Sequence, residues 1–473
     1  MNFAETLVCA AATHPERIAV SADGRSVTYA ELHDAAARVA GMLVERGLDP
    51  GDVVAVMLTN GPELPACYFG ALLAGATVTT LNPMLREGEV ERLMRDSGAR
   101  FFVGDADGAI RPAEAQRARP LDAPVERTGD EAAVLVYSSG TTGDAKAAEM
   151  THSNLDAVSA AVLSAIGDWA DTPAALCAAP FFQGFGQGCG MNAMVRAGAS
   201  IFTFERFDAA RTLALLEEHR IPMLQAVPTM CHDILNLPEL RRRDVSRLRL
   251  CLTGGAAMPV DLLERVEREL GCEVLEGYGL TEAYRVAMNR PGRRRPGSIG
   301  LPLPGVEVRI VDPDGELWIR GPNVMRGYWR NPEATARVIR DGWLRTRDVA
   351  YVDDDGYLFV VGRVDDVITR GGYKVHPAEV ERTLREHPSV ADAAVVAVPD
   401  ERLGSEVGAA VIPAAGHEVD ADELAAYVRA RIAPYKYPRV IWSVQDLPRG
   451  VTGKVLRRQI PLPQMAVSRG ESA

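Results

Sequence analysis

The N-terminal part of the chain alternates short, nearly continuous apolar runs with stretches of helical periodicity, and this alternation restricts the fold more than any other feature. Residues 52–58 (DVVAVML), 75–81 and 100–103 have the pattern of buried strands. Residues 63–73 and 87–97, which lie between them, carry apolar residues at helical spacing. Strands that alternate with helices in this way predict a doubly wound α/β architecture with a parallel sheet.

The helix predicted at residues 28–48 has the clearest start signal. Thr28 is followed three residues later by Glu31, which is the pattern of a capping box. Residues 105–130 are rich in Pro, Ala and Asp and lack periodicity, so they are predicted to form a connecting loop. The same reasoning predicts helices at residues 154–166 and 207–219, and strands at residues 174–179, 223–226 and 249–252.

The pattern changes after Gly305. Short strands are predicted at residues 306–311, 316–320 and 357–361, separated by D-P-D-G and D-D-D-G turns that are typical of antiparallel sheets and barrels. A chain of 473 residues is too long for one compact core. We place a domain boundary at the charged segment GRVDD, which predicts a large domain at residues 1–363 and a small one at residues 364–473.

The small C-terminal domain is predicted to mix helices with strands. The helices are expected at residues 377–387 and 422–431, and the strands at residues 390–398 and 408–413.

Composition and charge exclude several classes of protein. The formal net charge is −12, which argues against nucleic-acid binding through a general basic field. The seven cysteines form no C-x-x-C pair, and their odd number indicates a reducing compartment. Neither a signal peptide nor an apolar stretch of about 18 residues is apparent, so we expect a cytoplasmic protein without a membrane span.

The stretch YSSGTTGDAK at residues 137–146 follows a short apolar run. Its small hydroxyl residues and two glycines let backbone N–H and side-chain O–H groups close around a phosphate, and Lys146 adds a positive charge. The order of residues is not that of the Walker A loop. The alternative, taken alone, is a flexible surface loop.

The segment GYGLTE at residues 277–282 comes directly after a predicted strand. The hydroxyl of Thr281 beside the carboxylate of Glu282 suits the binding of phosphate and Mg²⁺, and Tyr278 offers a flat face to a base. The alternative is a helix N-cap pair beside a core tyrosine.

Two further segments carry charged residues at loop positions. Asp348 follows GWLRTR, where a carboxylate can accept both ribose hydroxyls with help from Arg363; a surface salt bridge is the alternative. Lys454 lies in PRGVTGKVLRR, where glycines permit a tight loop that extends the lysine into a cleft; a solvated basic tail is the alternative.

The glycine-rich segment at residues 182–190 (FQGFGQGCG) has two interpretations, and both stay open here. Such a turn can let a ligand approach the backbone, or it can allow a helix to pack closely. His152 is interpreted as a packing residue. We find neither a Ser/His/Asp arrangement nor an H-E-x-x-H motif.

Together, six segments resemble the adenylate-forming enzymes, the superfamily of acyl-CoA synthetases, luciferases and adenylation domains. They occur in the family's order and extend over nearly the whole chain: YSSGTTGDAK, EGYGLTE, GWLRTRD, GRVDDVITRGGYKVHPAEVE, APYKYP and LPRGVTGKVLRR. The resemblance implies a large N-terminal domain of two α/β subdomains plus a β-barrel, with a small α+β C-terminal lid.

The resemblance also implies a reaction in two steps. A carboxylate attacks the α-phosphate of ATP with Mg²⁺ present, which gives an acyl-adenylate and pyrophosphate. The lid then rotates, and a thiol of CoA or of a carrier protein's pantetheine takes the acyl group. The implied partners are a small carboxylic acid and an acyl carrier protein, and a homodimer is compatible with the family.

By the same resemblance, individual residues acquire expected roles. Lys454, Thr281 and Glu282 are the expected catalytic residues: Lys454 bridges the carboxylate and the α-phosphate, Thr281 contacts the α-phosphate, and Glu282 binds the metal. Asp365 matches the hinge. The residues expected to bind ATP are Ser138, Ser139, Gly140, Thr141, Thr142, Gly143, Lys146, Gly255, Glu276, Tyr278, Gly279, Asp348 and Arg363. Gly371 and Gly372 match the thiol tunnel, and the expected acid pocket contains Phe182, Gln183, Gly184, Ala226, Gly254 and Arg285.

Several positions depart from the family's usual pattern. Gln183 replaces a frequent histidine at the entrance to the acid pocket, and it carries no charge near neutral pH. Arg347 stands where a glycine usually precedes the ribose-binding aspartate. Ala145, Ala147, Thr369 and Gly450 also differ from the common residues. These departures leave the expected catalytic groups in place, but they raise the question of how the thiol step proceeds.

The substrate is only partly indicated. Gly277 stands where malonate-activating relatives carry an arginine, which disfavours malonate. The aromatic and small residues of the pocket segments favour a small or medium acid. We hypothesise that Arg285 meets a second acidic or polar group on the substrate; an outward arginine in a salt bridge is the alternative.

Two other functions remain open from the sequence. The first is an adenylating enzyme that serves a carrier protein, an amine or another nucleophile, or that activates an unconventional oxyacid such as nitrite. The second is a non-catalytic nucleotide-binding regulator.

Overall fold

The computed structural model describes residues 1–137, 146–167, 173–312, 315–370, 373–400, 402–449 and 455–463. Its contacts divide the chain into two compact units. The first unit contains Met1–Val308, Ile319–Arg345 and Asp354–Leu358, and the second contains Arg309–Trp318, Thr346–Asp353 and Phe359–Ala473. The boundary predicted between residues 363 and 364 remains a prediction.

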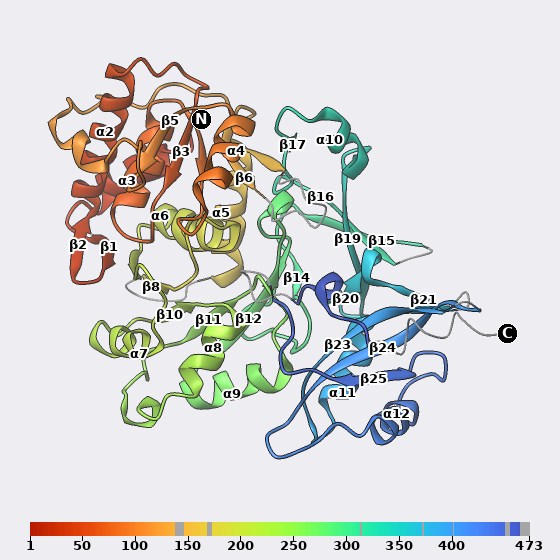
Figure 1. The fold of residues 1–473 in the computed structure, drawn as a ribbon. Coiled ribbons are helices and arrows are strands. Elements are labelled where there is room, and N and C mark those ends of the chain that lie inside the picture. Colours follow the sequence, from red (N-terminus) through yellow and green to blue (C-terminus); the bar gives the residue numbers. More distant parts are fainter. Residues whose placement is uncertain are drawn as a thin grey trace. The chain divides into compact units, whose positions relative to one another are not determined.

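The first sheet has the strand order β17-β7-β6-β4-β3-β5, and α2, α3 and α4 belong to the same part of the chain (Figure 1). Strands β3 to β6 pair in parallel, as predicted, whereas β7 pairs antiparallel with both β6 and β17. The bounds are β3 (Val53–Met57), β4 (Thr77–Thr80), β5 (Ala99–Gly104), β6 (Ala132–Tyr137), β7 (Ala147–Thr151), β17 (Gly327–Tyr328), α2 (Tyr29–Glu45), α3 (Glu63–Leu73) and α4 (Glu87–Ser97).

The predicted capping box begins α2. The Thr28 hydroxyl accepts a hydrogen bond from the backbone N–H of Glu31 (3.2 Å), and the Glu31 carboxylate accepts one from the Thr28 N–H (2.8 Å). Two otherwise unpaired backbone donors are thereby satisfied, which fixes where the helix starts.

The second sheet has the order β14-β13-β12-β11-β10-β8-β9-β1-β2. Its central strands β9, β8, β10, β11 and β12 pair in parallel, and buried side chains such as Leu213 of α7, Ile234 of α8 and Val266 of α9 form a core with β10. The strand bounds are β1 (Ile18–Ala22), β2 (Arg25–Thr28), β8 (Ala174–Cys177), β9 (Ser200–Thr203), β10 (Met223–Gln225), β11 (Leu250–Thr253), β12 (Glu273–Tyr278), β13 (Ala287–Met288) and β14 (Leu301–Pro302). The helix bounds are α1 (Glu5–Thr13), α5 (His152–Ile166), α6 (Ala193–Arg196), α7 (Ala209–Glu218), α8 (Pro228–Leu235) and α9 (Val260–Leu270).

Strands β15, β16 and β20 lie at the positions predicted after Gly305, and they belong to a third sheet with the order β15-β16-β19-β18, in which β20 pairs with β19. Strands β18 and β19, which were not predicted, pair antiparallel. The bounds are β15 (Glu307–Val311), β16 (Glu316–Arg320), β18 (Ile339–Arg340), β19 (Trp343–Val352), β20 (Leu358–Arg363) and α10 (Pro332–Val338).

The C-terminal part of the second unit combines a three-stranded sheet, β23-β24-β25, with α11 and α12 (Figure 1). Val395 and Ala409 of the sheet share a core with Leu384 of α11 and Leu424 of α12, so these predicted elements are confirmed as an α+β fold. The bounds are β21 (Ile368–Arg370), β22 (Tyr373–Val375), α11 (Pro377–Arg385), β23 (Val390–Asp400), β24 (Gly404–Pro413), α12 (Ala421–Arg429) and β25 (Val440–Ser443).

Three local predictions were wrong. Strand β7 was not predicted, because its sequence AAEMT is short and contains only one β-branched residue, Thr151. The segment at residues 182–190 is not only a turn, since Phe185–Asn192 forms a π-helix. The expected loop at residues 105–130 contains a 3-10 helix at Pro112–Arg117.

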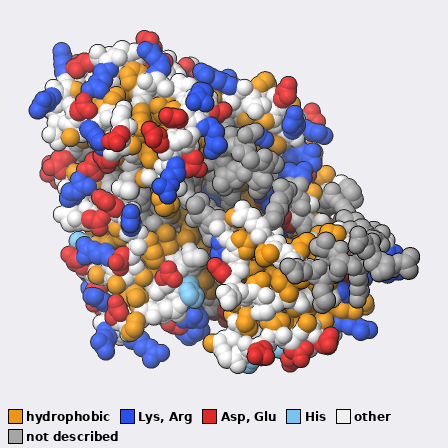
Figure 2. Space-filling model, viewed as in Figure 1, with side chains coloured by type: hydrophobic (Ala, Val, Ile, Leu, Met, Phe, Trp, Pro, Cys, Tyr) orange, Lys and Arg blue, Asp and Glu red, His pale blue; other side chains and the backbone are white. Residues whose placement is uncertain are grey.

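The described surface mixes charges of both signs. On the face shown in Figure 2, acidic and basic side chains alternate over the surface instead of gathering in one basic patch. None of the described helices combines the length and the apolar character that a membrane crossing requires. The seven cysteines are free thiols, and all except Cys9 are buried.

Candidate functional site

The turn that follows β12 holds five of the residues that the sequence singled out, Tyr278, Gly279, Thr281, Glu282 and Arg285. Strand β12 ends at Tyr278, a 3-10 helix covers Thr281–Ala283, and the chain returns when the Val286 N–H donates to the Tyr278 carbonyl (2.8 Å). Ligands of α/β proteins bind outside the carboxyl ends of parallel strands, and this turn lies at such an end. We call residues 278–286 the β12 turn.

Glu282 is held in place by Tyr328 of β17. The Tyr328 hydroxyl donates to Glu282 Oε1 (2.7 Å), and the Met325 N–H donates to the Glu282 carbonyl (2.8 Å). Because one carboxylate oxygen is fixed by a tyrosine, the orientation of the whole carboxylate is fixed. Tyr328 was not predicted from the sequence, although the aromatic pair in Gly327-Tyr328-Trp329 beside a turn was a weak signal.

Tyr328 also faces Lys146. The Lys146 ammonium lies 5.6 Å from the centroid of the Tyr328 ring, which is within cation–π range. Strands β7 and β17 are paired so that Tyr328 lies opposite Ala148. The lysine at the end of the predicted phosphate loop and the predicted metal-binding carboxylate are therefore arranged around one tyrosine.

The predicted loop connects two antiparallel strands. Strand β6 ends at Tyr137 and β7 begins at Ala147, and these two residues are register partners. Strand β7, which was not predicted, follows the loop, and the predicted helix follows β7. This helix, α5, begins at His152 with Thr151 as its cap, close to the predicted start. Ser138, Ser139, Gly140, Thr141, Thr142 and Gly143 lie outside the described residues.

Two of the predicted glycines are required by the backbone. Gly255 has φ +81°, in the left-handed region that other residues rarely adopt. A Cβ on Gly279 would come within 1.9 Å of the Tyr284 carbonyl oxygen, so only glycine fits at position 279 of the β12 turn. Both positions lie at the carboxyl ends of neighbouring strands, β11 and β12.

Glu276 is buried inside β12. Its Oε1 accepts a hydrogen bond from the Met258 N–H (3.0 Å). Burial raises the pKa of Glu276 to about 7, although the Met258 N–H and the positive charge of Arg285 oppose this rise. The expected role of Glu276 in binding the cofactor remains a prediction.

The expected acid-pocket residues come from separate elements of the first unit. Ala226 is fully buried after β10, Gly254 is buried after β11, and Gly184 begins the π-helix. The Phe182 carbonyl accepts a hydrogen bond from the Thr80 hydroxyl (3.2 Å), and the Gln183 carbonyl accepts one from the Gln187 N–H (2.8 Å).

Tyr284 explains the glycines of the π-helix segment. A Cβ on Gly188 would lie 2.6 Å from the Tyr284 ring, and one on Gly184 would lie 3.5 Å from it. The Tyr284 hydroxyl donates to Gln187 Oε1. Of the two interpretations left open, close packing therefore describes Gly188, which makes room for a large buried side chain, whereas a Cβ on Gly184 would make only an ordinary contact.

Arg285 points into the protein. The residue is 1% exposed, and its guanidinium lies over the Phe185 ring, 5.2 Å from the centroid. The alternative of an outward arginine in a surface salt bridge is therefore wrong.

In the second unit, Asp348 and Arg363 form an ion pair. Arg363 Nε lies 3.4 Å from Asp348 Oδ1, and the Asp348 side chain is 14% exposed. The Thr346 hydroxyl accepts a hydrogen bond from the Asp348 N–H (3.0 Å). Arg347 has φ +60°, a conformation that suits glycine, which accounts for the glycine usual at this position in the family.

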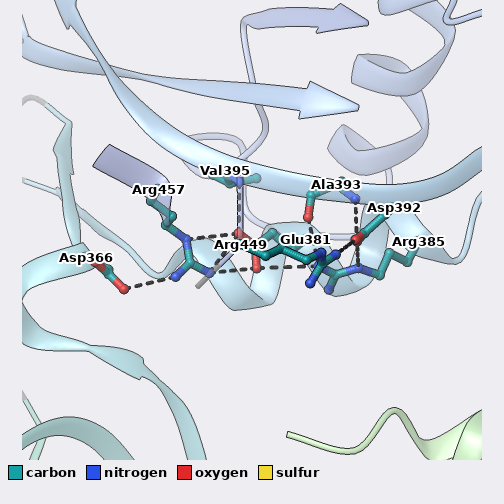
Figure 3. Close-up of polar contacts among 8 residues, drawn as sticks. All are labelled: Asp366, Glu381, Arg385, Asp392, Ala393, Val395, Arg449 and Arg457. Carbon is teal, nitrogen blue, oxygen red and sulfur yellow. Dashed lines mark hydrogen bonds and ion pairs between the residues drawn. The ribbon is translucent and has the colours of Figure 1, made fainter. Parts of the chain in front are cut away.

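The chain on either side of Lys454 is anchored by arginines (Figure 3). Arg449 forms an ion pair with Asp392, and Arg457 bonds to both Glu381 and Asp366. Lys454, Gly371 and Gly372 lie outside the described residues. The backbone of Asp365 belongs to a 3-10 helix at Val364–Asp366, beside the Asp366 that Arg457 contacts.

Other features lie apart from these groups. The His152 ring is buried, its Nδ1 accepts the Phe3 N–H (3.0 Å), and burial lowers its pKa to about 4, which agrees with a packing role. A cavity of about 740 Å³ contacts α2, α3 and the 105–116 segment, and none of the predicted site residues lines it. Among the described residues, no group of three or more His, Cys, Asp or Glu side chains is placed to hold a metal.

Comparison with known proteins gives matches along most of the chain. A family model described as AMP-binding enzyme matches residues 8–329, and one described as AMP-binding enzyme C-terminal domain matches residues 379–454. Feruloyl-CoA synthase from an Amycolatopsis species is 37% identical over 471 residues, which covers 94% of this chain and 96% of that protein. Long-chain-fatty-acid–CoA ligase from Bacillus subtilis is 32% identical over 522 residues, which covers 96% of this chain and 93% of the relative.

The fold is also similar to solved structures. The crystal structure of ATP-bound MatB from Rhodopseudomonas palustris superposes with a TM-score of 0.91 at 30% sequence identity. The match covers 97% of this chain and 99% of that chain.

Proposed function

The chain belongs to the AMP-binding enzyme family, and from this premise we propose that it activates a compact carboxylic acid and transfers it to coenzyme A. It is an AMP-forming acid–thiol ligase of the adenylate-forming superfamily. In the first step a carboxylate oxygen attacks the α-phosphorus of ATP, and the bond to the bridging oxygen breaks so that pyrophosphate leaves. In the second step a thiolate attacks the acyl carbon, and AMP leaves.

Phosphoryl transfer depends mainly on positioning and on neutralising charge. The observation that carries our assignment is the convergence of Lys146 and Glu282 on Tyr328. We assign Lys146, with the hydroxyls of the loop at residues 138–142, to the β- and γ-phosphates. Thr281, one residue before Glu282, is assigned to the α-phosphate. The Asp348–Arg363 pair is assigned to the ribose hydroxyls.

Glu282 suits a magnesium ion bound together with ATP. Mg²⁺ prefers oxygen ligands and is usually held by one or two carboxylates plus substrate phosphates. A single oriented carboxylate fits this mode of binding, in which the phosphates of ATP supply further ligands. When bound, the ion would neutralise phosphate charge, and this chain's contribution is the orientation of Glu282 by Tyr328.

The acid is proposed to be small or medium. The names of the relatives do not decide this, since one is a feruloyl-CoA synthase and another a long-chain-fatty-acid ligase. We rely on Tyr284 and Arg285, two large buried side chains packed against Gly184, Gly188, Gly254 and Gly277. Space that such glycines would leave for a long acyl chain is filled by the protein itself.

Acid-dependent exchange of pyrophosphate into ATP tests this function directly. A panel should include short aliphatic, aromatic and long-chain acids, and nitrite as an unconventional oxyacid. We expect exchange with compact acids and little with long-chain ones, followed by AMP release that depends on CoA. AMP release that requires a carrier protein or an amine instead would replace the proposed acceptor. ATP binding without exchange for any acid would support a non-catalytic regulator.

Replacing Tyr328 with phenylalanine is expected to weaken magnesium binding. The change removes only the hydroxyl that orients Glu282 and keeps the ring beside Lys146. Loss of such a supporting hydrogen bond commonly costs about 10- to 100-fold in metal affinity or activity. Titration of exchange activity with Mg²⁺ should therefore show a half-maximal concentration raised by about 10-fold or more.

The control is Tyr357→Phe. Tyr357 also donates a hydrogen bond, to the Arg293 carbonyl (2.6 Å), and Arg293 is not one of the assigned site residues. Each variant should lose about 1 kcal/mol of stability from its missing hydrogen bond. If both variants respond to Mg²⁺ alike, Tyr328 does not orient a metal-binding carboxylate.

A further inference from the structure

Arg285 is a buried residue of the β12 turn. It is 1% exposed and ranks among the largest fully buried side chains of the described residues. Its guanidinium lies over Phe185, and Cβ atoms on Gly254 or Gly277 would approach it to 2.7 Å and 2.6 Å. Gly254 follows β11, and Gly277 lies in the neighbouring strand β12. Both glycines leave room for the Arg285 side chain.

The guanidinium has few hydrogen-bond partners. An arginine carries five N–H donors and is always charged. In this chain Nη2 makes two long contacts of 3.4 Å, to the Thr253 carbonyl and to Met288 Sδ. Nε is buried without a partner, and within the described part of the chain no carboxylate forms an ion pair with Arg285. A buried charge without a partner is strongly unfavourable, and an opposite charge that binds there would offset this cost.

Glu276 does not satisfy this charge. Its Oε1 is occupied by the Met258 N–H, and its Oε2 is buried without a partner, so the two side chains influence each other without a direct bond. Burial raises the pKa of Glu276 to about 7, so near neutral pH a large fraction of this carboxyl is uncharged. Glu276 therefore offsets the positive charge of Arg285 only in part.

The position of Arg285 relates it to the acid. It lies on the β12 turn, four residues after Thr281, which we assign to the α-phosphate that the carboxylate attacks. The residues around the guanidinium, Phe185 and Gly254, border or belong to the expected acid pocket. A substrate held next to Thr281 and reaching into this region would meet the unpaired donors.

We propose that Arg285 binds a second anionic group of the substrate, so that the preferred substrate class is a compact acid with two negative groups, one activated and one held by the guanidinium. This inference rests on the proposed function. A carboxylate accepts two parallel hydrogen bonds from a guanidinium and supplies the missing charge. A neutral acid of the same shape would leave the buried arginine unpaired, which penalises its binding.

The first test compares matched acids on the unaltered enzyme. Succinate and butyrate differ by one carboxylate in place of a methyl group, and so do terephthalate and 4-methylbenzoate. In acid-dependent pyrophosphate exchange, we expect kcat/KM for at least one diacid to exceed that of its neutral partner by about 100-fold. Equal use of the partners, or preference for both neutral acids, would overturn the proposal while leaving acid activation intact. Absence of exchange with every acid would instead count against the proposed function.

The second test changes the arginine. Arg285→Met keeps length and removes charge, so it should lower kcat/KM for the preferred diacid by about 100-fold, leave the neutral partner unchanged or improved, and leave ATP affinity unchanged. Arg285→Lys, which keeps the charge but cannot bind in bidentate fashion, should lie between. Arg290→Met serves as the control, because Arg290 is a partly buried arginine that bonds to the Pro302 carbonyl (3.2 Å).

A purely structural arginine gives a different outcome. In that case Arg285→Met lowers kcat/KM equally for diacid and neutral acid, as Arg290→Met does, and the proposal fails. If Arg285→Met does not fold, Arg285→Lys and the acid pairs on the unaltered enzyme still test the proposal. Each of these tests measures the ratio of kcat/KM for diacid and neutral acid within one protein.

Discussion

Replacing Lys454 with alanine is expected to reduce acid-dependent pyrophosphate exchange by about 100- to 1,000-fold. The resemblance to the adenylate-forming enzymes implies that this lysine bridges the attacking carboxylate and the α-phosphate, two negative groups that must approach each other. Removing one preorganised positive group from a developing charge commonly has an effect of this size. The thiol step needs no such bridge, so thioester formation from a supplied acyl-adenylate should fall by less than about 10-fold.

Lys436→Ala is the matched control. Lys436 lies in the same part of the chain, but it bonds to Glu379 through both carboxylate oxygens (2.8 Å each). Its loss should affect stability slightly and both half-reactions equally. If Lys454→Ala lowers adenylation and thioester formation to the same extent, the assigned role is wrong.

The parallel sheets were predictable because their strands read as continuous apolar runs between amphipathic helices. Residues 52–58 and 75–81 correspond to β3 and β4, and the Thr28–Glu31 pair correctly marks the start of α2. Burial on both faces removes the alternation of polar residues, so such strands are easy to recognise. Strand β7 could not be recognised, since its place is determined by pairing with β6 and β17 and not by its own composition.

Glu282, Asp348 and Lys146 were predicted as site residues from short motifs, and their roles stay predictions. Tyr328 was not predicted, because its position beside Glu282 and Lys146 comes from a strand pairing between segments about 180 residues apart in sequence. The sequence also left open whether the Arg285 side chain points into the protein or outward. Whether an arginine after a turn points outward or inward depends on the glycines opposite it, and Gly254 and Gly277 come from different strands.

The arginines in Figure 3 connect the chain beside Lys454 to a rigid framework. Arg457 Nη2 bonds to both oxygens of Glu381 (2.9 Å each), and the Val395 N–H donates to Glu381 Oε1 (2.9 Å). The backbone closes in the same place, where Arg449 pairs with Val455 and the Leu456 N–H donates to the Pro448 carbonyl (2.7 Å). Both ends of the segment that carries Lys454 are therefore fixed against α11 and β23.

Arg457 also reaches the expected hinge. Its Nη1 lies 3.0 Å from Asp366 Oδ2, and Asp366 follows Asp365 directly. One side chain thus joins the Lys454 segment to the residues at which the lid is expected to rotate. We infer that Arg457 is a positioning residue for Lys454, because it connects the chain beside that lysine to the expected hinge.

Two variants, Arg457→Met and Asp366→Asn, separate the contact of Arg457 with Glu381 from its contact with Asp366. Asp366→Asn separates them more sharply, because it changes only the second contact. Arg457→Met should lower pyrophosphate exchange by about 100-fold, because a displacement of about 1 Å at a reacting group has an effect of that order. It also leaves the buried Glu381 without its main partner and so costs stability, about 3–5 kcal/mol. Asp366→Asn keeps the Arg457–Glu381 bonds, so we expect near-normal stability and a changed ratio of adenylation to thioester formation.

Arg385→Met provides the comparison for this pair, since Arg385 bonds to Asp392 (2.7 Å) and to the Ala393 carbonyl (2.8 Å) in the same cluster but contacts neither Asp366 nor Arg457. Its loss should lower stability without changing the ratio of the half-reactions, measured as exchange against thioester formation from supplied adenylate. A ratio that stays constant in Asp366→Asn would show that the contact between Arg457 and the hinge does not influence the lid. If Arg385→Met changes the ratio of the half-reactions as much as Asp366→Asn does, the cluster acts only through stability. A specific link to the hinge requires that loss of the Asp366 contact changes this ratio and that loss of the Asp392 contact does not.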